Sequence, residues 1–192
     1  MEPSPSDARL AAALAAIDAA NAADPGREGD APAALLYGER MSAELARLFP
    51  AASDHLRIAA RGQHVERWKL PREDYPEGRA GYLAWRAEQG RRHAARVDGL
   101  MAEAGYPEPD RARVAALLRK EGIKRNPETQ ALEDVICFVF LRWYFAAFAA
   151  KHPDEEILRI VAKTARKMSP EARARALAEF DLPPPLAAAI AE

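Results

Sequence analysis

Positively charged side chains are concentrated between His55 and Arg96, a stretch with ten Lys or Arg and five Asp or Glu residues. Guanidinium groups hold phosphate or carboxylate through paired N–H donors. The surplus therefore predicts a site for a small anionic, phosphorylated molecule. The residues assigned to this ligand are Arg61, Arg67, Arg72, Arg86 and Lys120. The alternative is a solvated helix face whose arginines pair with neighbouring acids.

A second group of residues has the chemistry of a metal site. Asp134 lies among apolar residues of a helix, and a carboxylate placed there requires a partner. An Arg or Lys side chain is one candidate, and a metal shared with His64 and His93 is the other. Imidazole and carboxylate ligands suit zinc, iron or manganese. We expect His64, His93 and Asp134 to hold such a divalent ion, with Glu133 as the catalytic base.

The elements that must position these residues are predicted to be helices. Arg57, Arg61, His64 and Trp68 follow one another at spacings of four, three and four, which predicts one face of a helix from Ser53 or Asp54 to about Lys69. Two prolines and a glycine predict a loop over Leu70–Gly78. A long helix is expected over Arg79–Ala104 and a short one over Asp110–Glu121, each followed by a glycine.

The rest of the chain continues the helical pattern. Asn126, Pro127 and Glu128 provide a cap, a first-turn proline and a first-turn acid for a helix that reaches Ala150. Apolar residues occupy every face of this helix, so we expect it to be buried and central. We predict an all-α fold of seven to nine helices without strands: a single multi-helix domain over 31–182, an N-terminal helix and loop over 1–30, and a C-terminal tail over 183–192.

Composition excludes several classes of function. The 28 basic and 29 acidic residues nearly cancel, so we expect neither polymeric nucleic acid nor a membrane surface as a partner. Cys137 is the only cysteine, and no secretory signal is visible at the N-terminus. These features predict a cytoplasmic protein. Nothing in the sequence predicts its oligomeric state.

Several short segments together resemble a family of uncharacterised proteins, the domain-of-unknown-function family 4202. The resemblance covers about Ala33 to Phe180 and implies no activity. The segments are Tyr37-Gly-Glu-Arg-Met41, Ala59-Ala-Arg-Gly-Gln-His-Val-Glu-Arg-Trp68, Pro71-Arg72, Gly81-Tyr-Leu-Ala-Trp-Arg86, Leu132-Glu-Asp-Val135, Phe140-Leu141 and Lys163-Thr-Ala-Arg-Lys-Met-Ser169.

The same region more remotely resembles the HD-domain metal phosphohydrolases, an all-helical superfamily. His93 matches the first histidine of that pattern and Asp134 its last aspartate, but Arg119 and Lys120 occupy the positions of the His-Asp dyad. The resemblance implies an HD-like fold and a metal-dependent phosphohydrolase. Because cationic side chains do not ligate a divalent metal, the competing prediction is a catalytically inert pseudo-enzyme or scaffold with a buried salt-bridge network.

Overall fold

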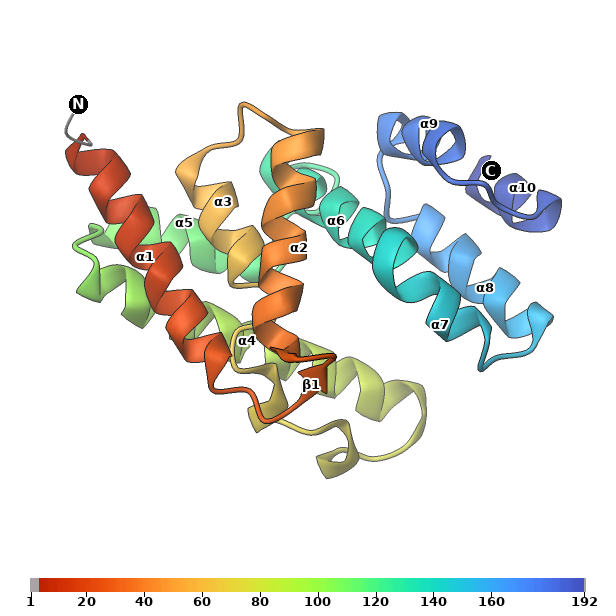
Figure 1. Cartoon of the computed structure of the whole chain (residues 1–192), viewed down its shortest axis with the longest axis horizontal. Helices are drawn as coiled ribbons and strands as arrows, with labels where there is room; N and C mark the ends of the chain where they lie inside the picture. Colours follow the sequence, from red (N-terminus) through yellow and green to blue (C-terminus); the bar gives the residue numbers. More distant parts are fainter. Residues whose placement is uncertain (1–3, 192) are drawn as a thin grey trace. The chain divides into compact units, whose positions relative to one another are not determined.

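The computed structural model describes residues 4–191 and confirms the all-α prediction (Figure 1). These residues form ten α-helices, which exceeds the seven to nine expected. The helices belong to two compact units, Met1–Glu121 and Gly122–Glu192. No helix within the described range is both long enough and apolar enough to cross a lipid bilayer.

The first unit contains five α-helices and two 3₁₀ turns. Ser4 caps the first helix through a reciprocal capping arrangement with Asp7. Helix α4 packs against α5, and α2 packs against both α1 and α3. The elements are α1 (Pro5–Ala22), α2 (Ala33–Leu48), α3 (Asp54–Arg61), η1 (Arg67–Lys69), η2 (Arg72–Asp74), α4 (Gly78–Glu103) and α5 (Glu108–Leu118).

A two-residue antiparallel ladder joins α1 to α2, so the expectation of no strand is wrong here. Strand β1 (Arg27–Glu28) pairs with β2 (Ala31–Pro32) across a turn in which Gly29 has a φ of 59°. The Asp24 carboxylate accepts hydrogen bonds from the backbone N–H groups of Gly26 and Ala34, which ties this turn to the start of α2. Local turn chemistry, rather than strand periodicity, explains the ladder.

The core of the first unit takes one apolar face from each helix. Ile17, Met41, Ile58, Val97 and Leu117 come from five different helices, and all are fully buried. This packing fixes the backbone of α4 and α5, on which the candidate site is built.

The second unit is organised around the helix predicted to be the most buried. Asn126 caps it as expected, and nine of the 13 residues of α6 are buried. The helix continues through a π turn over Phe140–Tyr144, and the segment set apart as a tail folds as α10. The elements are α6 (Pro127–Val139), η3 (Phe140–Tyr144), α7 (Phe145–Ala149), α8 (Asp154–Ala165), α9 (Pro170–Glu179) and α10 (Pro184–Ala191).

Candidate functional site

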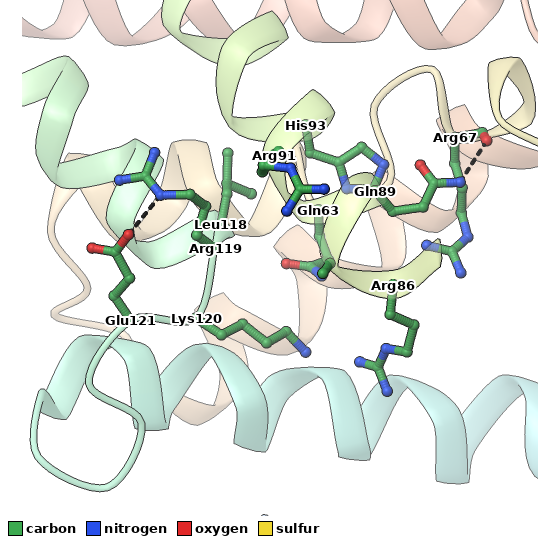
Figure 2. A pocket seen from close by; sticks show the side chains of 12 residues that line it. Gln63, Arg67, Arg86, Gln89, Arg91, His93, Leu118, Arg119, Lys120 and Glu121 are labelled. Carbon is green, nitrogen blue, oxygen red and sulfur yellow. Dashed lines mark hydrogen bonds and ion pairs between the residues drawn. The ribbon is translucent and has the colours of Figure 1, made fainter. Parts of the chain in front are cut away.

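A pocket of about 440 Å³ opens in the first unit between α4, the end of α5 and the segment that follows α3 (Figure 2). It has the size of a small-molecule site. Five of its residues are cationic and one is acidic. The lining residues are Gln63, Arg67, Arg86, Ala87, Gln89, Gly90, Arg91, His93, Leu118, Arg119, Lys120 and Glu121.

The helix expected to reach Lys69 ends at Arg61, so His64 and Trp68 do not share its face. Gly62 ends α3, and a Cβ at that position would lie 2.6 Å from Cγ2 of Val97 on α4. Only glycine therefore fits at this position beside α4. His64 lies in an irregular segment, and its ring stacks on Tyr37 with centroids 3.7 Å apart.

The loop before α4 is held by side chains of that helix. Gln89 Nε2 donates to the carbonyl oxygens of Arg67 and Leu70 at 3.0 Å, and Trp85 Nε1 donates to Leu70. Arg72 donates instead within the loop, to the carbonyls of Tyr75 and Pro76. Arg72 thus stabilises the loop and does not line the pocket.

The two predicted metal-binding histidines of this unit lie beside each other. The ring centroids of His64 and His93 are 6.2 Å apart. Burial, followed in effect by the charges of Arg67, Arg92 and Lys120, lowers the pKa of His93 from 6.5 to about 3. Burial also lowers the pKa of His64 well below its usual range, followed in effect by Arg67, His93, Lys120 and Arg86. Both imidazoles are therefore neutral at pH 7.

The cations of the pocket differ in their partners. Arg91 pairs with Glu88, and Arg119 pairs with Glu121 across 2.6 Å. Arg67 and Arg86 make no ion pair with the residues that the structure describes. Their guanidinium groups lie over aromatic rings, Arg67 at 4.5 Å from the Trp85 centroid and Arg86 at 5.8 Å from that of Tyr82. Neither guanidinium therefore has a carboxylate partner in the described part of the chain.

Arg61, also assigned to the ligand from the sequence, has a structural partner. Its guanidinium forms two hydrogen bonds with the Asp18 carboxylate of α1 and one with the Ser42 hydroxyl of α2. It joins three helices and does not line the pocket. Of the five predicted anion-binding residues, the structure brings Arg67, Arg86 and Lys120 together and places Arg61 and Arg72 elsewhere.

Lys120 adopts a backbone conformation that normally favours glycine. Its φ is 58°, and it follows the last turn of α5 in a Schellman arrangement: Lys120 N–H donates to the Leu117 carbonyl and Glu121 N–H to that of Ala116. A side chain in this left-handed conformation costs about 1 kcal/mol. The strained position directs the lysine side chain along the pocket (Figure 2).

The predicted acidic residues belong to the second unit, where each has a protein partner. Asp134 accepts from the Ser169 N–H and hydroxyl and from Gln130 Nε2, at 2.7 to 3.0 Å, which supports the cap of α9. Burial raises the pKa of Asp134, and these hydrogen bonds oppose that rise. Glu133 is also buried, 3.7 Å from Lys167.

No metal ligand set is evident from these positions. In residues 4–191, no three or more His, Cys, Asp or Glu side chains form a group that could hold a metal ion. The site of His64, His93 and Asp134 therefore stays a prediction.

Two buried polar atoms of the pocket were not anticipated from the sequence. Oε1 of Gln63 and Nε2 of His93 have no hydrogen-bond partner in the part of the chain described. An unsatisfied buried polar atom costs about 1–3 kcal/mol, and such atoms are uncommon in native proteins. Gln63 follows no pattern in the sequence that predicts a place in the pocket, apart from being next to His64. Gln89, which also lines the pocket, could have been assigned to it from the sequence, because it precedes His93 by one helical turn.

Comparison with known proteins gives a family without an activity. The model of the family described as Domain of unknown function (DUF4202) matches residues 11–190. No curated protein and no solved structure matches the chain significantly.

Proposed function

The chain belongs to the DUF4202 family of unknown function, and we propose from the site alone that its first unit binds a small phosphorylated anion in the pocket. One observation carries this proposal: Arg67, Arg86 and Lys120 line one pocket together with the neutral His93. A phosphate monoester brings up to two negative charges and three terminal oxygens, which arginine and lysine donors recognise through charge-assisted hydrogen bonds.

The backbone of Lys120 supports the same proposal. Residues other than glycine that are held in a left-handed conformation concentrate at functional sites, where the surrounding fold compensates for the strain. At this position glycine would fit the turn better, which supports a role for the lysine ammonium group in the pocket.

A metal-dependent phosphohydrolase is the second candidate, motivated by the remote HD-domain resemblance. The observation that favours it is the pair of neutral imidazoles, because the neutral form is the one that ligates zinc, iron or manganese. A bound ion would generate hydroxide at neutral pH for phosphoester hydrolysis. Since Arg67 and Lys120 repel a bare cation, we expect such an ion to enter only together with an anion.

The anion proposal is tested by replacing Lys120 with glycine. Lys120→Gly relieves the left-handed strain and removes the ammonium group, and the ligand-free melting temperature of the variant serves as its own baseline. The increase in melting temperature with inorganic phosphate should shrink or vanish, because a ligand that binds the native state stabilises it by mass action. Scanning calorimetry over a range of phosphate concentrations measures both quantities.

Lys124→Gly is the matched control. Lys124 also has a positive φ, 67°, but it is exposed, belongs to the second unit and does not line the pocket. This variant should keep the full phosphate response. An equal response in Lys120→Gly and the wild-type protein, or no response in either, would overturn the proposal. Repeating the scan with zinc or manganese plus phosphate tests the metal: a shift no larger than with phosphate alone would reject the second candidate.

A further inference from the structure

The pocket has hydrogen-bonding groups that a phosphate alone cannot satisfy. Building on the proposed anion site, we infer that its ligand is a phosphomonoester that also carries hydroxyl groups, of the sugar- or polyol-phosphate class. The inference rests on Gln63 and His93, which are 8% and 3% exposed and both line the pocket. Each has a buried polar atom without a partner, Oε1 of Gln63 and Nε2 of His93.

The chemistry of these two atoms restricts what can meet them. Oε1 of Gln63 only accepts hydrogen bonds, whereas Nε2 of neutral His93 donates or accepts according to its tautomer. The dianion of a phosphomonoester has only acceptor oxygens at its phosphate and cannot donate to Gln63. The ligand must therefore present a second group with a proton to donate.

The charge of the pocket selects the kind of donor. Arg67, Arg86 and Lys120 oppose an ammonium group, as they oppose the protonation of His64. A neutral donor is required. A hydroxyl group meets the requirement, because it donates to Gln63 and can at the same time accept from or donate to His93.

The arrangement of the pocket leaves space for both parts of such a ligand. In the view of Figure 2, the Gln63 amide lies between the His93 ring and the side chain of Lys120, with Arg86 on the other side of the opening. The volume of about 440 Å³ exceeds what a phosphate ion fills and is in the range of small-molecule sites. The phosphate is thus assigned to Arg67, Arg86 and Lys120, and the hydroxyls to Gln63 and His93.

A matched pair of ligands tests the inference on the full-length protein. Glycerol 3-phosphate and n-propyl phosphate have the same carbon chain and differ by two hydroxyl groups. Isothermal titration calorimetry should show glycerol 3-phosphate binding at least about tenfold more tightly than n-propyl phosphate. In Gln63→Met, which keeps the side-chain length but removes the acceptor, this ratio should fall towards one while n-propyl phosphate binds as in the wild-type protein.

The outcomes separate the inference from the proposed function. If no phosphate compound binds, the anion site itself is rejected. If both esters bind equally well to the wild-type protein, the anion site stands and the hydroxyl assignment is overturned, as expected where a buried water satisfies Gln63. The wild-type comparison decides the question even if Gln63→Met fails to fold.

Discussion

At the scale of single residues, similar side chains have different roles according to their partners. Arg67 and Arg86 lie over aromatic rings at the pocket, whereas Arg61 is engaged by Asp18 and Arg72 by carbonyl groups of its own loop. All four were assigned to one ligand from the sequence. Only two of them line the pocket. The count of basic residues in the sequence therefore overestimated how many arginines belong to the proposed anion site.

Arg61 gives a residue-level prediction about stability. Its ion pair with Asp18 is partly buried, with side chains 16% and 32% exposed. Removing one partner should therefore cost more than an exposed pair and less than a fully buried one, about 1–2 kcal/mol. We expect Arg61→Ala to lower the free energy of unfolding in urea by this amount and to leave the phosphate response unchanged.

Arg57→Ala is the comparison on the same helix. Arg57 is exposed and lies 3.8 Å from Asp54, so its replacement should change stability by less than about 0.5 kcal/mol. Equal effects of the two substitutions, or a phosphate response lost in Arg61→Ala, would contradict the structural role given to Arg61.

At the scale of elements, the loop before α4 depends on a close contact with the helix that follows it. A Cβ on Gly81 would lie 1.9 Å from the carbonyl oxygen of Pro76. The loop carries Leu70, whose carbonyl is bonded by Trp85 and Gln89. The close approach at Gly81 and these hydrogen bonds together hold the loop against α4.

Gly81→Ala should force the loop and helix apart. We expect the variant to lose at least about 1–3 kcal/mol of unfolding free energy, as overpacked positions do. Gly99→Ala is the control in the same helix, because nothing lies within 4 Å of a Cβ there and alanine favours helix by about 0.5–1 kcal/mol. Thermal unfolding followed by circular dichroism should move in opposite directions for the two variants. A rise in melting temperature for Gly81→Ala would show that the loop is not constrained by this contact.

At the scale of the whole molecule, the stability of the protein should depend on pH through its buried histidine. His93 has a usual pKa of 6.5 and a pKa of about 3 when folded. Between these values the unfolded chain binds a proton that the folded protein does not, so stability is complete above pH 6.5 and falls as the pH decreases towards 3. One such group contributes at most about 1.4 kcal/mol per pH unit.

His93→Gln removes this titration. We expect urea unfolding between pH 4 and pH 7 to show a shallower decrease in stability for the variant than for the wild-type protein. Parallel pH profiles would indicate that His93 is not held neutral by its burial and by Arg67, Arg92 and Lys120.

The sequence by itself determined the all-α class and several helix boundaries, because helix capping and helix termination depend on residues that are close in the sequence. Asn126 caps α6 as predicted, and α4 ends at Glu103, one residue before the expected end. The spacing of residues did not predict every helix end. The helix expected to reach Lys69 stops at Arg61, and Gly62 after it lies against Val97 of α4.

Only the tertiary structure decided which residues form the pocket. Asp18 is 43 residues from Arg61, and Ser169 is 35 residues from Asp134, yet these partners determine the roles of the arginine and the aspartate. The spacing of residues within a helix predicts a shared face but not what that face meets. The unpartnered atoms of Gln63 and His93 became visible for the same reason, since burial and the absence of a partner within the described chain are properties of the packed fold.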